Sequence, residues 1–365
     1  MHILNGKSTV RENSPYLLPS FYASAIVWII HSHTFLAKRY LMQAMTSVSG
    51  RKLILVGRRT IDDTRVIIKS ASDSTGKAEL IHERTCREVL NRIGFAYQTF
   101  HSPEELGSID IVGRTVTITR FIEQGQAFIE RPLKEQFNFA LAAFKAQEGA
   151  HATTASHFAL VQKTFGSMGA QDYLDKFIMF KQALEKHHPP ESDLIFLCTR
   201  GLALLRSNTF TLQQYAGFLT HIDFVPHNFR IVEKDIYLLD HSSMRFGNKY
   251  EGWARFVNFM SLYNPLLASS LIQYVRDNRT NEESLALKLM RAYRLGELIM
   301  YYQNTLDKST GNLLTLNTAR LNFWKNVFCA VLDNEDIPKD VRMEYISLRD
   351  SLRSDEEKIR QQVLH

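Results

Sequence analysis

The stretch HIDFVPHN at residues 221–228, followed by Asp240, decides how this 365-residue chain is interpreted. Asp223 stands five positions before Asn228. Two short apolar runs, IV and IYLL, separate Asn228 from Asp240 and predict a strand hairpin. Such a hairpin would return Asp240 to the loop that carries the other two side chains. The sequence therefore predicts one site with two carboxylates and one amide.

These three side chains suit phosphoryl transfer from a nucleotide. The transition state is loose, so the protein mainly positions the reactants and neutralises charge on oxygen atoms. We expect Asp223 to accept the proton of the attacking hydroxyl, and Asn228 and Asp240 to hold Mg²⁺ through oxygen. We expect His221 to hydrogen-bond the backbone near Asp240 and fix the loop. An ordinary polar loop is the alternative that the spacing alone leaves open.

A cation for the nucleotide phosphates is predicted upstream. The β-branched run RVIIK ends at Lys69, as a strand that carries a phosphate-binding lysine does. A helical pattern follows over residues 74–93 and contains three glutamates. We expect Glu83 to pair with Lys69 and hold it over the phosphates. Glu79 and Glu88 are the alternatives.

These features resemble the aminoglycoside phosphotransferase and choline kinase family, the small-molecule branch of the protein-kinase-like fold, over roughly residues 50–260. The family motif reads H-G-D-x-x-x-x-N, then a strand and I-D-W. Here Ile222 replaces the glycine, and His241 follows Asp240. The resemblance implies an α+β fold with two lobes, a small β-rich N-lobe and a larger, mainly helical C-lobe.

The resemblance also implies ATP and Mg²⁺ as cofactors and suggests further nucleotide contacts. Residues 117–125 are similar to the family's hinge strand, whose backbone would pair with adenine, and they include Phe121 and Glu123. The turn that should cover the phosphates has Ser49 and Gly50 as candidates, without a G-x-G-x-x-G pattern. Phosphate contact there would depend on few backbone donors.

An aromatic tract follows Asp240, and we expect its role to be structural. Tyr250, Trp253 and Phe256 are spaced nearly as the buried side of a helix is. An aromatic cage for a quaternary amine is the alternative.

The lobes are predicted from these motifs. Residues 42–123 would form the nucleotide-binding N-lobe, and residues 124–365 the C-lobe with the catalytic loop. Residues 1–41 would be a leader that is partly helical or loosely ordered, with an amphipathic helix over His31–Met45. Long helical patterns predict the acceptor side at 266–276, 282–306 and 313–332.

Composition indicates a globular protein with enough apolar material for two lobes. Hydrophobic residues make up 45% of the chain. The net charge of +6 raises the question of nucleic acid, but no recognition motif accompanies the scattered basic residues, so we expect none. The positive balance also argues against a polycationic acceptor. Nothing in the sequence indicates an oligomeric state.

Three widely spaced cysteines, Cys86, Cys198 and Cys329, form no C-x-x-C motif. We therefore expect a reduced, cytoplasmic compartment, without zinc or disulfides. The apolar run at residues 21–30 is too short to span a bilayer, so no membrane partner is expected, although an anchor stays open. Translation from Met42 or Met45 is a further alternative.

The function expected first is an ATP- and Mg²⁺-dependent phosphotransferase with a small-molecule hydroxyl as acceptor. An atypical protein kinase is one alternative, but the chain has Asp240-His241-Ser242 in place of D-F-G and no A-P-E. A nucleotide-binding pseudokinase that serves as an interaction module is another, suggested by the poor glycine turn. The set Lys69, Asp223, Asn228 and Asp240 argues against it.

Overall fold

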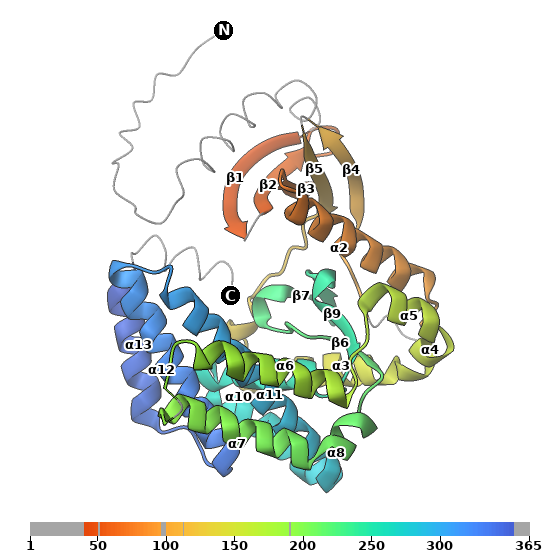
Figure 1. The fold of residues 1–365 in the computed structure, drawn as a ribbon. Helices are drawn as coiled ribbons and strands as arrows, with labels where there is room; N and C mark the ends of the chain where they lie inside the picture. Colours follow the sequence, from red (N-terminus) through yellow and green to blue (C-terminus); the bar gives the residue numbers. More distant parts are fainter. Residues whose placement is uncertain (1–39, 50–51, 96–99, 112, 190, 354–365) are drawn as a thin grey trace. The chain divides into compact units, whose positions relative to one another are not determined.

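The structure, a computed structural model, describes residues 40–49, 52–95, 100–111, 113–189 and 191–353 (Figure 1). The described chain forms two compact units. The first unit contains residues 40–80 and 104–121, and the second contains 81–103 and 122–353. The predicted boundaries after residues 41 and 123 stay predictions.

The first unit is built on one antiparallel sheet with the strand order β1-β2-β3-β5-β4. Its strands are β1 (Tyr40–Ser49), β2 (Lys52–Arg59), β3 (Arg65–Ala71), β4 (Glu105–Ile111) and β5 (Arg114–Arg120).

Alternation along β3 explains how this sheet forms its core. Val66 and Ile68 are completely buried, whereas Ile67 and Lys69 are partly exposed on the other face. The buried side chains join Leu53 and Leu55 of β2 and apolar residues of β5 in a small separate core. Lys69 therefore lies on the face opposite the core, with its backbone between Ile54 and Thr117.

The helix predicted over His31–Met45 is wrong for residues 40–45, which belong to β1; its earlier part lies outside the described residues. This segment pairs along its length with β2. A neighbouring apolar strand offers backbone partners that override a weak local helical pattern.

The predicted helix after β3 is confirmed as α2 (Ser74–Arg92). Asp73 precedes it, and its carboxylate accepts a hydrogen bond from the Gly76 amide at 3.0 Å. The residues up to Leu80 belong to the first unit and those from Ile81 to the second.

The second unit is mainly helical. Its first part contains the short 3₁₀ helix η2 (Phe128–Glu130) and the helices α3 (Leu133–Gly149), α4 (His151–Ser156), α5 (Phe158–Phe165), α6 (Ala170–Glu185), α7 (Asp193–Ser207) and α8 (Thr209–Gln214). Its last part contains α9 (Glu251–Tyr263), α10 (Pro265–Asn278), α11 (Asn281–Leu306), α12 (Gly311–Asp333) and α13 (Lys339–Leu352). The helices predicted at 266–276, 282–306 and 313–332 are thus confirmed.

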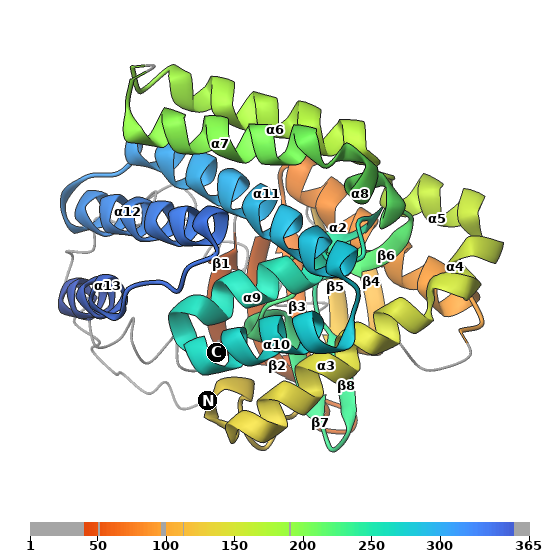
Figure 2. The ribbon, with the colours of Figure 1, turned by 90° about the horizontal axis from the view of Figure 1, so that it is seen from below.

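Helix α11 organises this unit. It packs against α6, α7, α9 and α12, and α6 and α7 lie side by side along it (Figure 2). Gly296 permits this approach, because a Cβ there would lie 2.4 Å from a ring atom of Phe177. No helix of the described residues is both long and apolar enough to cross a bilayer, and the run at 21–30 lies outside them.

Helix α9 is buried on almost every side. From Glu251 to Leu262, every residue except Arg255 is buried. Glu251 accepts hydrogen bonds from the Tyr173 hydroxyl at 2.7 Å and from Arg245 at 3.0 Å, which satisfy its buried carboxylate. Because the aromatic residues of this tract are core residues, the alternative of an aromatic cage is wrong; its members Tyr250, Trp253 and Phe256 are at most 1% exposed.

Candidate active site

A two-stranded sheet and a hairpin carry the predicted catalytic residues. Strands β6 (Phe218–His221) and β9 (Met244–Gly247) pair, and between them lie the paired strands β7 (Phe229–Val232) and β8 (Asp235–Leu238). The Ile222 amide donates to the Ser243 carbonyl at 2.8 Å, and the Leu239 amide donates to the Asn228 carbonyl at 2.9 Å. These bonds tie the segments around Asp223, Asn228 and Asp240 together, as the sequence predicts.

Both carboxylate oxygens of Asp223 are engaged. Arg255 Nε donates to Oδ1 at 2.7 Å, and Asn228 Nδ2 donates to Oδ2 at 2.8 Å. Burial raises the pKa of this carboxyl, but the charge and hydrogen bond of Arg255 outweigh that effect and bring the pKa to about 2. The Asp223 carboxylate is therefore ionised at neutral pH and held in one orientation, so it can accept a proton.

Arg255 is the site residue that sequence reasoning missed. It lies 32 positions after Asp223 on the otherwise buried helix α9, where its side chain keeps 19% exposure. The only sequence signal was a charge inside an apolar helical tract. A single buried arginine usually needs a carboxylate partner, and the packing of α9 supplies Asp223.

The donor set of Asn228 and Asp240 fits a hard cation. The Asn228 amide nitrogen is used on Asp223, which leaves its carbonyl oxygen as the atom to offer a metal. Asp240 accepts hydrogen bonds from Ser242 at 2.6 Å and Ser243 at 2.7 Å, which orient its two oxygens. These oxygens suit Mg²⁺, which keeps several waters and needs few protein ligands.

His221 is fully buried, and burial lowers the pKa of its imidazole against the opposing charges of Asp240 and Asp223. The Asp240 backbone is one of the groups that act on the pKa of this ring. The predicted hydrogen bond between the ring and the backbone near Asp240 stays a prediction. What fixes His221 is its backbone amide, which donates to Gln147 Oε1 at 3.1 Å.

Helices α3 and α9 hold strand β6 from two directions. Gln147 of α3 accepts from the His221 amide and is itself 7% exposed. At Gly252 of α9, an added Cβ would lie 2.7 Å from Thr220 Oγ1 and 2.8 Å from the His221 carbonyl oxygen. The close approach of α9 to β6 therefore requires glycine at that position.

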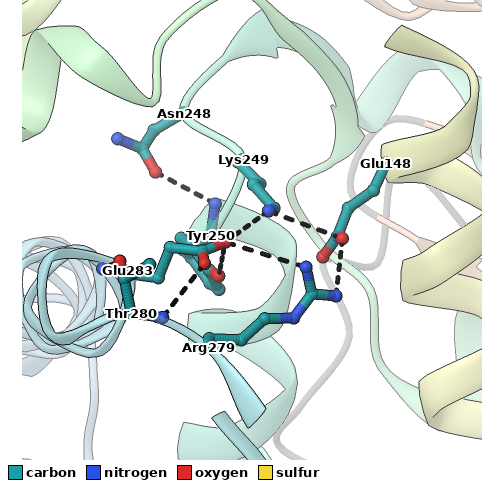
Figure 3. A network of polar contacts seen from close by, with 7 residues as sticks. All are labelled: Glu148, Asn248, Lys249, Tyr250, Arg279, Thr280 and Glu283. Atoms are coloured by element: carbon teal, nitrogen blue, oxygen red, sulfur yellow. Dashed lines mark hydrogen bonds and ion pairs between the residues drawn. The ribbon is translucent and has the colours of Figure 1, made fainter. Parts of the chain in front are cut away.

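A polar network joins the end of α3 to the starts of α9 and α11 (Figure 3). Lys249 Nζ lies 2.6 Å from Glu283 Oε1 and 3.5 Å from Glu148 Oε2. Arg279 donates to Glu148 Oε2 at 2.8 Å. Because Glu148 directly follows Gln147, the network fixes the helical turn that holds the catalytic strand.

Glu83 also lies near this centre. It is 2% exposed and contacts Arg87 at 3.4 Å. Burial and then the charges of Glu83 and Asp240 raise the pKa of the Cys86 thiol to about 12, which places both carboxylates close to this thiol. The alternatives Glu79 and Glu88 form other pairs, with Lys52 at 3.2 Å and with Arg84 at 3.1 Å.

The remaining predicted nucleotide contacts are spread over both units. Lys69, Ser49 and Phe121 belong to the first unit, and Glu123 to the second, where it is exposed. Gly50 lies outside the described residues, between β1 and β2. Strand β5 ends at Arg120, so the predicted hinge from Phe121 onward is not a strand. Phe121 is held by its amide, which donates to the Arg65 carbonyl at 2.9 Å.

Comparison by sequence, with family models and with curated proteins, gives no match. Comparison with solved structures gives many. Aminoglycoside phosphotransferase APH(2'')-Ib bound to ADP is similar over 83% of this chain and 99% of its own, with 12% identity and a TM-score of 0.56.

Two further structures extend this likeness beyond aminoglycoside enzymes. The amicoumacin kinase hAmiN, in complex with AMP-PNP, Ca²⁺ and amicoumacin (Ami), is similar over 88% of this chain and 98% of its own, with 12% identity and a TM-score of 0.54. An ethanolamine kinase of Plasmodium vivax is similar over 90% of this chain and 98% of its own, with 11% identity and a TM-score of 0.51. The predicted α+β fold class is confirmed: the chain has the protein-kinase-like fold of the aminoglycoside phosphotransferases and ethanolamine kinases, with a β-sheet N-lobe and a mainly helical C-lobe.

Proposed function

We propose that this protein is an ATP- and Mg²⁺-dependent phosphotransferase that moves the γ-phosphate to a hydroxyl of a small molecule. One observation carries the proposal: backbone hydrogen bonds and hairpin pairing gather Asp223, Asn228 and Asp240 in one loop region. The fold supports it, because it is shared with kinases whose structures hold ADP or AMP-PNP.

The residues have distinct roles in the proposed reaction. The acceptor oxygen forms a bond to the γ-phosphorus, the bond from that phosphorus to the β–γ bridging oxygen breaks, and ADP leaves. The hydroxyl proton passes to Asp223. A carboxylate with a pKa of about 2 is a weak base, but the loose transition state lets this transfer occur late, so orientation matters most. Arg255 and Asn228 provide that orientation.

Bound Mg²⁺ would neutralise charge on the phosphates. Asn228 and Asp240 would hold it through the oxygens described above. Lys69 and Glu83 would anchor the α- and β-phosphates, Ser49 and Gly50 would cover them, and the segment with Phe121 and Glu123 would pair with adenine.

The proposed setting is the cytoplasm, with no nucleic-acid partner. All three cysteines are free, two of them buried, which is consistent with a reduced compartment.

The test is ATP turnover with Mg²⁺ over pooled acceptors: amino alcohols, sugars, sugar phosphates, hydroxy acids, nucleosides and aminoglycosides. We expect Asp223→Ala to lower turnover by about 100-fold or more while nucleotide still binds. Asp240→Ala should remove Mg²⁺-dependent nucleotide binding. The matched control is Asp175→Ala, an exposed carboxylate on α6 that accepts only from Gln171.

The outcomes separate the alternatives. Turnover of one pool that is lost in Asp223→Ala supports the proposal and identifies the acceptor class. Nucleotide binding without phosphorylation of any pool would contradict it and direct the search to a protein substrate. Equal loss of nucleotide binding in Asp223→Ala and Asp240→Ala would mean that the loop had collapsed. Near-ultraviolet circular dichroism would reveal such a change.

A further inference from the structure

One face of α9 leads away from the catalytic carboxylate. Arg255, Phe259 and Tyr263 are spaced four residues apart and therefore share that face. The Arg255 guanidinium carbon lies 5.9 Å from the centre of the Phe259 ring, and Phe259 stacks on Tyr263 at 4.4 Å. The result is a strip that begins at Asp223 and continues over two aromatic rings.

Further arginines gather around this strip from the last two helices. Arg349 of α13 lies 5.9 Å from the Tyr263 ring, and Arg320 of α12 lies 5.8 Å from the Tyr302 ring. Burial raises the pKa of Tyr302, and the charges of Arg320 and Arg255 both oppose this, so both guanidinium groups lie near that hydroxyl.

Arg353 completes the group at the C-terminal end of α13. Burial raises the pKa of Tyr263, and the charges of Arg349, Arg353 and Arg320 all lower it, so these three arginines act electrostatically on one phenol. We call the set Arg255, Arg320, Arg349 and Arg353 the arginine surface.

The arginine surface has too few carboxylates among the described residues. Arg255 pairs with Asp223, and Arg349 with Asp350 at 2.7 Å. In the part of the chain that the structure describes, the hydrogen-bond partner of Arg320 is the neutral amide oxygen of Asn317, at 2.9 Å.

Arg353 has no carboxylate partner in the described part of the chain, and its Nε is buried without a hydrogen-bond partner there. Burial lowers the pKa of Arg353, and the charges of Arg349 and Arg320 lower it further. Like charges held together and partly out of water are unfavourable unless an anion binds them.

We propose that the arginine surface binds an anionic group of the acceptor, so that the substrate is a hydroxyl compound that also carries a phosphate or a carboxylate. This rests on the proposed function. Guanidinium groups bind both anions through paired hydrogen bonds. The rings of Phe259, Tyr263 and Tyr302 hold three of the guanidinium groups by cation–π contacts, which fixes where the anionic group would bind.

Arginines beside Asp223 would also favour the reaction of an anionic acceptor. Donor and acceptor would both be anionic, and fixed arginine charges beside Asp223 reduce their repulsion in the transition state. A quaternary amine or a polycationic acceptor would be repelled by Arg320 and Arg353, which have no carboxylate partner among the described residues.

The test compares acceptors that share a carbon skeleton and differ in one anionic group: glycerol with glycerol 3-phosphate, ribose with ribose 5-phosphate, and glucose with glucuronate, beside choline and kanamycin. We expect the phosphorylated or carboxylated member of at least one pair to be used with a kcat/KM at least tenfold higher. Arg320→Gln and Arg353→Gln should each raise the acceptor KM by about tenfold or more, with a much smaller effect on kcat. Arg320→Lys, which keeps the charge, should recover part of the loss. The matched control is Arg206→Gln, an exposed arginine at the end of α7.

The outcomes distinguish this inference from the proposed function. Turnover only with neutral or cationic acceptors would overturn the inference and leave the phosphotransferase in place. An unchanged KM in both glutamine variants would overturn it as well. No turnover with any acceptor would overturn the proposed function, and the inference with it. Thermal unfolding of each variant shows whether a raised acceptor KM results from partial unfolding of the protein.

Discussion

Asp223 is a carboxylate on which two opposing effects act. Burial alone would raise its pKa, whereas the Arg255 guanidinium at 2.7 Å lowers it to about 2. The ionised form is the one that can accept the hydroxyl proton. In the proposed reaction Arg255 would therefore keep Asp223 ionised at low pH, although it also makes Asp223 a weaker base.

This balance predicts a shifted pH profile for Arg255→Gln. Without the Arg255 charge, only the smaller effects of His227 and His221 oppose burial, so the pKa of Asp223 rises and its ionised fraction falls as the pH is lowered toward that pKa. We expect the acidic limb of kcat/KM to move to higher pH, by about one unit or more. The measurement is a pH–rate profile with one acceptor that begins at about pH 2.5, close to the pKa of Asp223, and extends to pH 8.

Arg206→Gln is the control for this profile, because its side chain is exposed on α7. If kcat/KM of Arg255→Gln depends on pH as that of the unmodified protein does, even with a lower absolute rate, Arg255 does not set the protonation of Asp223.

The residues of this site differ in how far the sequence could reveal them. His221, Asp223, Asn228 and Asp240 fall within 20 positions and follow a spacing that phosphoryl transfer requires, so they could be predicted. Arg255 could not, because its role depends on which turn of a buried helix faces the loop. The contact of Gln147 with the His221 amide could not be predicted either, because it joins residues 74 positions apart.

At the scale of elements, the catalytic strand depends on a close contact with α9. Gly252 lies where a Cβ would meet Thr220 Oγ1 and the His221 carbonyl oxygen at 2.8 Å or less. The carbonyl is backbone, so it cannot move aside as a flexible side chain can. Gly149, near the end of α3, has nothing within 4 Å of its added Cβ.

This contrast gives a matched pair of substitutions. Gly252→Ala should lower the free energy of unfolding by about 1–3 kcal/mol and reduce kcat, because β6 and the following Asp223 must shift. Gly149→Ala should be neutral or stabilise by about 0.4–1 kcal/mol. Urea unfolding together with turnover measures both effects. Equal stability and activity in the two variants would mean that β6 tolerates displacement.

Elements were predictable where periodicity was long. The patterns of α10, α11 and α12 extend over several turns and bury a continuous side, so their positions were read from the sequence alone. Strand β1 was not, because residues 40–45 also fit a helical pattern, and pairing with β2 decides their conformation.

For the whole molecule, the two units have separate hydrophobic cores. Lys69 lies on the sheet of the first unit, and Asp223 and Asp240 lie on hairpins of the second. A sequence can predict that such residues serve one nucleotide only through a known order of motifs, because no local rule relates residues of separate units. The proposal that they act on one nucleotide is therefore tested with the nucleotide itself.

A ligand that binds only the folded protein stabilises it by mass action, by about 2.7 kcal/mol at a hundredfold excess over Kd. We expect ATP with Mg²⁺ to raise the Tm of the unmodified protein and of Asp223→Ala by several degrees. Lys69→Ala and Asp240→Ala should lose most of this shift while keeping the Tm of the free protein. Lys134→Ala, an exposed lysine of α3, is the control and should keep the shift. A lowered Tm of Lys69→Ala without nucleotide would instead mean that Lys69 stabilises the fold of its sheet. A Tm shift with ATP and Mg²⁺ that persists in both Lys69→Ala and Asp240→Ala would mean that neither residue takes part in nucleotide binding.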